Sequence, residues 1–184
     1  MLNSENLYFF VGKSGSGKDS IMLKTAEILT QENLKIHVLK RLITRPPHPS
    51  EPFISVSEEE FLKFKEEGKF VLDWYVYGKY YGCLVELEEY LKKGYMVFVN
   101  VSRAILFNAR KKYPKSKIIL IEVDVKLATQ RISNRSREDD KLQERKARME
   151  IDIEIPSPDL IVKNNGVLEE PVAKVVQFIK RSLI

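Results

Sequence analysis

The sequence predicts an α/β fold in which a central, mostly parallel sheet carries helices on both faces. Short apolar segments, rich in β-branched and aromatic residues, alternate along the chain with stretches of helical periodicity. The first such segment, residues 7–11, runs directly into a glycine-rich turn, and a helical pattern follows at once. The length of 184 residues, 43% of them hydrophobic, suits one domain with a full core.

Five short segments are the expected strands of the central sheet. They are residues 7–11, 35–39, 95–101, 117–123 and 159–162. Helical patterns begin near residues 18, 102, 126 and 168. Because a helix that links two strands of one sheet leaves those strands parallel, this order predicts the parallel sheet and its two helical layers.

The run after the first strand matches a phosphate-binding loop (P-loop) at every position but the last. It consists of Gly12, Lys13, Ser14, Gly15, Ser16, Gly17, Lys18, Asp19 and Ser20. The glycines let backbone N–H groups turn inward around phosphate oxygens, the next helix directs its positive end at the same anion, and the lysine reaches the outer phosphates. The sequence therefore predicts a P-loop NTPase that binds ATP through this run.

Asp19 stands where a Ser or Thr hydroxyl ordinarily meets magnesium in such a loop. A bare carboxylate about 4 Å from a phosphate oxygen is repelled by roughly 4 kcal/mol at an effective dielectric of about 20, so a cation is expected between them. Mg²⁺ is the predicted cation, with Asp19 as a direct or water-bridged ligand. The alternative is that Asp19 only caps the helix that begins here and binds no metal.

Residues 41–92 interrupt the alternation and are expected to form a small inserted substrate-binding lobe. A turn-rich stretch opens it, and Ser57 and Glu60 have the spacing of a capping box at the start of a short helix. Arg41 and Arg45 follow the second strand, where ligands of open α/β sheets bind, so a second anionic substrate is expected there. The alternative is that both arginines pair with surface acids.

The later part of this lobe has the pattern of a β-hairpin. Residues 70–75 and 80–84 flank a predicted turn at Gly78-Lys79. The aromatic side chains of the hairpin, Trp74 and Tyr81 among them, are expected to serve mainly in packing. Tyr81 precedes a glycine, however, so its hydroxyl is also a candidate to contact a phosphate.

Residues 131–148 are almost wholly charged and predict a helical, arginine-rich lid on the single domain, residues 1–184. Arg131 and Arg135 share one helical face, and Arg145 lies further along. Phosphoryl transfer needs cations around the transferred group, and the fixed charge and planar fork of arginine suit that task. The alternative is a solvated helix whose arginines pair with the neighbouring acids.

The charge balance indicates an anionic small molecule as partner. The chain carries 31 Lys and Arg against 26 Asp and Glu, a formal charge of +5, and its arginines cluster while its lysines are scattered. A phosphorylated sugar or nucleotide fits this distribution better than nucleic acid, for which a basic and aromatic stripe is expected. Cys83 is the single cysteine, which excludes an intramolecular disulfide and indicates a reducing compartment. We therefore expect a cytoplasmic protein without membrane contact; oligomeric state is not predicted.

Together these motifs resemble the guanylate kinase superfamily. The likeness rests on the order of the P-loop, Ile43-Thr44-Arg45, Tyr80-Tyr81-Gly82, a strand ending near Asn100, and the arginine lid. Within the superfamily the chain is more similar to the ribose 1,5-bisphosphate phosphokinases. The features shared with them are the Asp after the P-loop lysine and the run Asn100-x-Ser102-Arg103.

The chain departs from the guanylate kinase pattern at positions that bind the base. That pattern has a serine where Arg41 stands, a tyrosine where Phe53 stands, and a threonine or serine where Cys83 stands. Loss of hydrogen-bond partners for a base costs orders of magnitude in discrimination. The departures are therefore those expected for an acceptor that lacks guanine and carries a second phosphate.

The resemblance implies ATP- and Mg²⁺-dependent phosphoryl transfer to the 1-phosphate of ribose 1,5-bisphosphate, giving 5-phosphoribosyl 1-diphosphate and ADP. It implies catalytic roles for Lys18, Arg131, Arg135 and Arg145. It implies substrate contacts by Arg41, Arg45, Tyr81, Asn100 and Arg103. Two other functions remain open: a nucleoside monophosphate kinase acting on GMP or a relative, and a non-catalytic guanylate-kinase-like binding module. Such modules usually lack the P-loop lysine and the lid arginines, which this chain retains.

Overall fold

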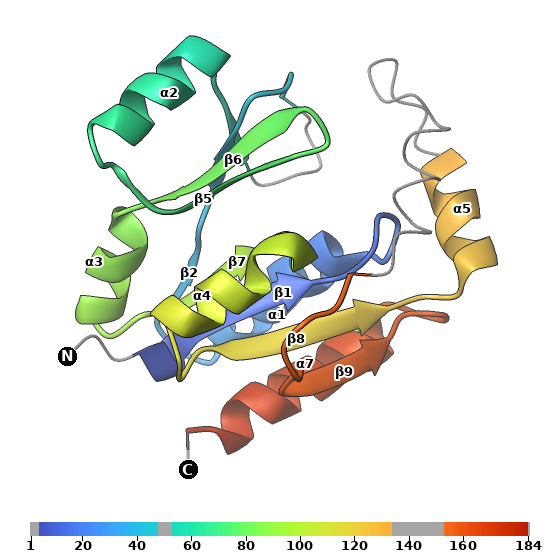
Figure 1. Cartoon of the computed structure of the whole chain (residues 1–184). Helices are drawn as coiled ribbons and strands as arrows, with labels where there is room; N and C mark the ends of the chain where they lie inside the picture. The colour runs from blue at the N-terminus through green and yellow to red at the C-terminus, as the bar shows by residue number, and fades with distance from the viewer. Residues whose placement is uncertain (1–3, 48–52, 134–152, 184) are drawn as a thin grey trace.

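The computed structural model describes residues 4–47, 53–133 and 153–183, and it holds two sheets (Figure 1). The larger has five strands and lies at the centre of the molecule. The smaller has four strands and, together with a short helix, forms a lobe above one end of the larger sheet (Figure 1).

The central sheet is parallel throughout. Its strand order is β2-β7-β1-β8-β9. The strands are β1 (Leu7–Val11), β2 (Ile36–Val38), β7 (Met96–Asn100), β8 (Lys117–Glu122) and β9 (Leu160–Lys163). β1 and β7 are buried along their whole length, as their continuous apolar sequences require. Each of the five predicted strands is thus confirmed, with shifts of one residue at some ends.

Helices cover both faces of this sheet, which confirms the predicted layering. On one face α1 (Lys18–Gln31) and α7 (Glu169–Arg181) pack on alternate side chains of β1 and β7, such as Tyr8 and Phe98. On the other face lie α3 (Glu86–Lys92) and α4 (Leu106–Lys112). Two short 3₁₀ turns, η1 (Ser4–Asn6) and η2 (Arg103–Ile105), precede β1 and α4. The helix α5 (Val125–Ser133) follows β8 and stands beside the P-loop end of the sheet (Figure 1).

The lobe contains a sheet of order β4-β3-β6-β5. Its elements are β3 (Arg41–Ile43), β4 (Phe53–Ser55), α2 (Glu58–Glu66), β5 (Phe70–Val76) and β6 (Lys79–Leu84). The capping box that begins α2 is confirmed: the Ser57 hydroxyl accepts from the Glu60 backbone N–H, and the Glu60 carboxylate accepts from the Ser57 backbone N–H. The three-residue strands β3 and β4 and the helix α3 were not among the predicted elements.

The two faces of the lobe sheet have different neighbours. α2 covers one face, where Phe61 is fully buried and stacks on Phe70 and Tyr80. The opposite face carries Leu72, Trp74 and Cys83, and these belong to the same hydrophobic cluster as β7 and the helices α3 and α4. This second face, which we call the inner face, is therefore the one that the lobe turns toward the central sheet.

The hairpin turn lies one residue earlier than predicted. Tyr77 and Gly78 are its central residues, with φ angles of 53° and 70°, and Lys79 already begins β6. Positive φ at both central residues is the geometry that matches the twist of a two-residue hairpin, and it fixes the turn at Tyr77-Gly78 instead of Gly78-Lys79.

None of the described helices combines the length and the apolar character that a membrane span requires.

The Cys83 thiol is expected to be inert in the folded protein. Burial raises the pKa of Cys83 to about 12, although the charge of Arg41 opposes the shift. Because the thiolate is the reactive form, the folded protein should take up almost no iodoacetamide at pH 8, while the urea-unfolded chain reacts as a free cysteine does. Mass spectrometry of the intact protein counts the adducts. Rapid labelling of the folded protein would contradict the buried placement.

Candidate active site

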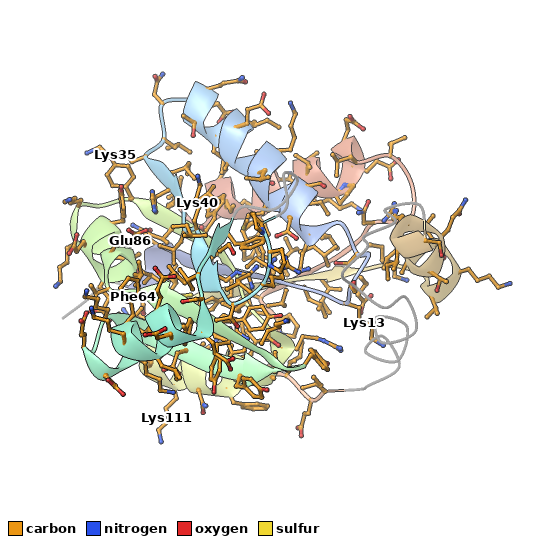
Figure 2. All side chains as sticks on the ribbon, turned by 90° about the horizontal axis from the view of Figure 1, so that it is seen from above. Lys13, Lys35, Lys40, Phe64, Glu86 and Lys111 are labelled. Carbon is orange, nitrogen blue, oxygen red and sulfur yellow. The ribbon has the colours of Figure 1, made fainter. Side chains whose placement is uncertain are left out.

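The P-loop follows β1, and two of its glycines have a left-handed backbone conformation. Gly15 and Gly17 have φ angles of +79° and +78°, which side chains with a Cβ rarely adopt. A Cβ at Gly15 would also lie 2.7 Å from the carbonyl oxygen of Ala128 in α5. Lys18 then begins α1, so the amino end of this helix lies at the carboxyl end of β1. Figure 2 shows Lys13 of the loop far from Lys35, which precedes β2, as expected at opposite ends of parallel strands.

Asp19 occupies the first turn of α1, and its carboxylate faces the end of β7. The Asn100 side-chain amide donates to Asp19 Oδ1 at 2.5 Å, and Lys18 Nζ lies 3.7 Å from Asp19 Oδ2. Asn100 is 5% exposed. Gly17, not Asp19, is the N-cap residue of α1, and no side chain caps that end. Asp19 is therefore not the N-cap residue, and its role as a metal ligand stays a prediction.

Two side chains from distant parts of the sequence approach Gly17. Asn164, directly after β9, is 3% exposed, and its amide donates to the Ser16 carbonyl at 2.7 Å. Arg131 of α5 brings Nη1 to 4.0 Å from the position that a Gly17 Cβ would take. This nitrogen is buried and has no hydrogen-bond partner among the described residues. A buried guanidinium nitrogen beside a P-loop is the donor that a phosphate oxygen requires.

These side chains fit a nucleotide with magnesium better than a metal held by protein alone. Among the described residues, no group of three His, Cys, Asp or Glu side chains is placed to hold an ion. Mg²⁺ is commonly bound through one or two carboxylates, water and substrate phosphates, so the single carboxylate of Asp19 suits that mode.

Arg41 is the most buried arginine among the described residues. It begins β3 on the inner face of the lobe and is 7% exposed. Within the described part of the chain its guanidinium has no hydrogen bond or carboxylate partner, and its Cζ lies 5.9 Å from the centroid of the Tyr81 ring. The surface-acid alternative is therefore wrong for Arg41 in the described residues. An unpaired buried charge is costly unless an anion meets it.

Tyr81 lies between Arg41 and Trp74. Its ring stacks on the Trp74 indole, with centroids 5.4 Å apart and planes within 6°. The three side chains come from three strands and form one continuous stack on the inner face.

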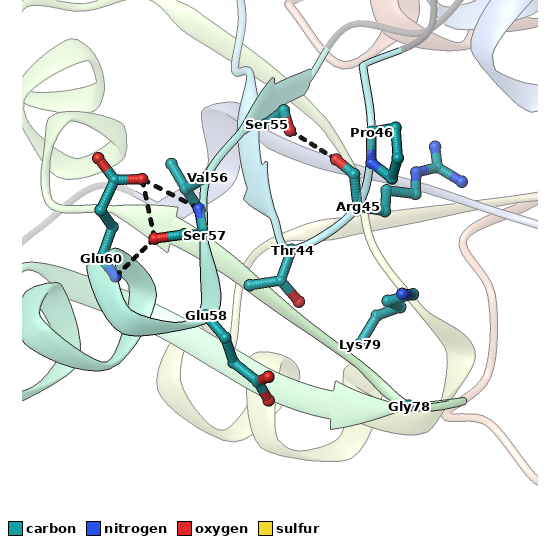
Figure 3. Close-up of a pocket in the computed structure, with 10 residues that line it drawn as sticks. All are labelled: Thr44, Arg45, Pro46, Ser55, Val56, Ser57, Glu58, Glu60, Gly78 and Lys79. Atoms are coloured by element: carbon teal, nitrogen blue, oxygen red, sulfur yellow. Dashed lines mark hydrogen bonds between the residues drawn. The ribbon is translucent and has the colours of Figure 1, made fainter. Parts of the chain in front are cut away.

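Arg45 lies two residues beyond β3, and its Cζ is 4.5 Å from the Phe53 ring. It lines a shallow hollow of about 480 Å³ on the lobe (Figure 3). Thr44, Ser55 and Lys79 also line this hollow. Arg41 and Arg45 have different surroundings: Arg41 is buried in β3, whereas Arg45 lies in the bend that follows this strand and lines the hollow.

Arg103 follows β7 and shares a separate cavity of about 450 Å³ with Lys13 of the P-loop and Asn165. This cavity places Arg103 on the nucleotide side of the site. Ser20 is exposed on α1. Arg135 and Arg145, like most of the predicted lid, lie outside the described residues.

The family model for guanylate kinase matches residues 4–182. The chain belongs to the guanylate kinase family, as a PhnN-type member. A protein of Brucella melitensis named ribose 1,5-bisphosphate phosphokinase PhnN is 32% identical over 85% of this chain and 81% of its own length. A protein of the same name from Psychromonas ingrahamii is 30% identical over 97% of this chain and 91% of its own.

Solved structures agree on the fold. A guanylate kinase from Anaplasma phagocytophilum superposes with a TM-score of 0.68 at 20% identity, covering 98% of this chain and 88% of its own. The predicted α/β P-loop kinase fold is thus confirmed, and this PhnN-type protein is an ATP-dependent kinase.

Two site residues of the PhnN-type kinase were not predicted to act there. Asn164 supports the P-loop from β9, although the sequence signals only an Asn-Asn-Gly run after a strand. Trp74, assigned to hairpin packing, joins the arginine stack on the inner face. Each contact joins residues that are close only once the sheets have formed.

Replacing Asn164 by Asp should weaken ATP binding about tenfold or more. The change keeps the side-chain shape but sets a carboxylate against the Ser16 carbonyl, and a buried acceptor left unpaired costs about 1–3 kcal/mol. Isothermal calorimetry with ADP measures the effect. Asn108→Asp, which adds the same charge at an exposed position of α4, is the control and should bind normally. Equal affinity in both variants would contradict the support role.

Proposed function

We propose that this kinase transfers the γ-phosphoryl group of ATP to the 1-phosphate of ribose 1,5-bisphosphate, giving 5-phosphoribosyl 1-diphosphate and ADP. The observation that carries the proposal is Arg41, which is 7% exposed and has no carboxylate partner among the described residues, on the face that the lobe turns toward the central sheet. The names of the PhnN relatives point to the same acceptor.

The polar groups of the inner face favour a phosphorylated sugar over a purine base. Arg41, Tyr81 and Trp74 offer N–H and O–H donors, and no described carboxylate lies on this face of the lobe sheet. Asp73 belongs to the opposite face, where Lys65 binds it at 2.6 Å. A guanine edge presents N–H groups that need acceptors, whereas phosphates present only acceptors.

Two arginines in the lobe suit an acceptor with two anionic groups. We assign Arg41 and Arg45 to its two phosphates, with the Tyr81 hydroxyl beside one of them. We propose that residues 41–92 form the acceptor-binding lobe and residues 131–148 the lid of a single domain, 1–184.

The reaction needs little from the protein beyond position and charge. A phosphate oxygen of the acceptor already carries the negative charge of a nucleophile, so no strong general base is required. This oxygen bonds to the γ-phosphorus while the bond from the γ-phosphorus to the β,γ-bridging oxygen breaks. Lys18 and Arg131 stabilise the charge on the transferred group, and we assign Arg135 and Arg145 to the same task.

Asp19 is the proposed protein ligand of magnesium, direct or through water. When bound, Mg²⁺ supplies charge neutralisation between the β- and γ-phosphates. Asn100 holds the Asp19 carboxylate in one orientation through its amide, and Lys18 balances the same carboxylate. We propose Arg103 as a further substrate contact on the nucleotide side.

The deciding assay supplies purified protein with ATP, Mg²⁺ and one acceptor at a time: ribose 1,5-bisphosphate, GMP, AMP or UMP. ADP release with the bisphosphate alone supports the proposal. Release with GMP instead would assign a nucleoside monophosphate kinase, and no release with any acceptor while ATP still binds would assign a non-catalytic module.

Replacing Asp19 by Ala should raise the Mg²⁺ concentration for half-maximal activity by about 10- to 100-fold, the scale at which supporting groups of metal sites act. Magnesium titration at fixed ATP measures it. The control is Asp73→Ala, which removes a carboxylate from the lobe face opposite Arg41. An unchanged magnesium dependence in Asp19→Ala would remove the metal role.

Replacing Arg41 by Ser should weaken acceptor binding by at least about 30-fold, since breaking a buried charge pair costs 2 kcal/mol or more. The KM for ATP should stay within about twofold, because Arg41 lies on the acceptor side. Steady-state kinetics with each substrate varied in turn separates the two. Arg181→Ser, at the end of α7, is the control. Equal losses for both substrates would contradict the assignment.

A further inference from the structure

Trp74 carries a buried polar group that its packing leaves unused. The residue lies on β5 opposite Tyr81 and is 9% exposed. Its indole Nε1 is buried and has no hydrogen-bond partner among the described residues. The hydrophobic cluster around it includes Val99 and Val101, which flank Asn100 at the end of β7. Trp74 therefore belongs to the core that joins the inner face of the lobe to the face of the central sheet covered by α3 and α4.

Packing alone does not account for an indole at this position. Buried tryptophans usually find a partner for the N–H group, and a buried donor left unpaired costs about 1–3 kcal/mol. A phenylalanine would supply a stacking ring for Tyr81 without that cost. The N–H group is therefore the part of Trp74 that needs a ligand.

A second unpaired donor lies in the same stack. Arg41 is 7% exposed, and its guanidinium contacts the Tyr81 ring whose neighbour is the Trp74 indole. The buried Trp74 Nε1–H and the guanidinium of Arg41, which has no carboxylate partner in the described residues, thus share one face and lie on either side of one ring. A ligand that satisfies both must present several acceptor oxygens over a short distance.

Resting on the proposed function, we infer that Trp74 is a specificity-determining residue of the acceptor site. Its Nε1–H donates to a phosphate oxygen of a small, doubly phosphorylated sugar, beside the phosphate that Arg41 binds. The parallel stack of Trp74 and Tyr81 also fills the inner face with rings, so that this face has no slot for a purine. Trp74 thus selects an acceptor that is rich in phosphate and free of a base.

The test compares Trp74→Phe with Tyr75→Phe in the full chain. Trp74→Phe keeps an aromatic ring on Tyr81 and removes the N–H donor, while Tyr75→Phe removes a hydroxyl from the next residue, which points to the opposite face. We expect the KM for ribose 1,5-bisphosphate to rise about tenfold in Trp74→Phe, as loss of a hydrogen bond to a charged group predicts, with the KM for ATP unchanged. Tyr75→Phe should match the wild type for both substrates.

Fluorescence gives a second readout that needs no variant, because Trp74 is the single tryptophan of the chain. Titrating ribose 1,5-bisphosphate into the wild-type protein without ATP should shift or quench its emission, and the same titration with GMP should not. Unchanged emission at a saturating concentration of a bisphosphate that the enzyme turns over would overturn the inference.

The outcomes separate the inference from the proposed function. If the wild type phosphorylates ribose 1,5-bisphosphate and Trp74→Phe keeps the wild-type KM, the role of Trp74 is wrong and the proposed reaction stands. If the wild type phosphorylates only a nucleoside monophosphate, the proposed reaction is wrong and the inference that rests on it falls too.

Discussion

Parallel pairing of β1 with its two neighbours is the constraint on which the site depends. The register sets Phe10 beside Asn100 on β7 and Val11 beside Leu120 on β8, so the segments that follow these strands emerge at one edge. That edge receives the P-loop, the Asn100 amide and, one strand further, Asn164. The side chains of Asn100 and Asn164 are short, and each reaches its partner only because the strands end at the same edge of the sheet.

The second organising feature is positive charge held in place without a protein anion. Arg41 in the lobe and Arg131 Nη1 beside Gly17 are buried or partly buried, and neither has a carboxylate partner among the described residues. Buried unpaired charge destabilises a protein by itself. Unpaired positive charge on two sides of the site is the property expected of a kinase that must hold two polyanions close together. The interactions that these charges lack in the protein are then available to bind the substrates.

The sequence predicts the central sheet and the P-loop well because both depend on local signals. β1 is a continuous apolar strand that runs straight into glycines, and its bounds are met to the residue. The lobe is less predictable: β3 and β4 have three residues each and are strands only because they pair with each other and with β6. The Tyr77-Gly78 turn was missed because a tyrosine with positive φ is uncommon.

The residues of the site also fall into those that local sequence signals predict and those that depend on the fold. The P-loop lysine and Asp19 follow from spacing, whereas the Asn164 bond to Ser16 joins residues 148 positions apart and has no local signature. Arg41 and Arg45 were correctly placed after the second strand, but their different surroundings became visible only with β3 and the strands beside it. The function of a short polar side chain at a strand end thus depends on which strands are neighbours, and composition does not contain that information.

The contact between Gly15 and Ala128 has a mechanical consequence. The loop meets the helix α5 backbone against backbone, with no side chain between them whose rotamers can absorb a displacement. A displacement of the loop toward α5 would therefore meet the backbone of Ala128 directly. Arg131 lies three residues further along α5, so the helix that carries this guanidinium is the one that packs against the P-loop backbone.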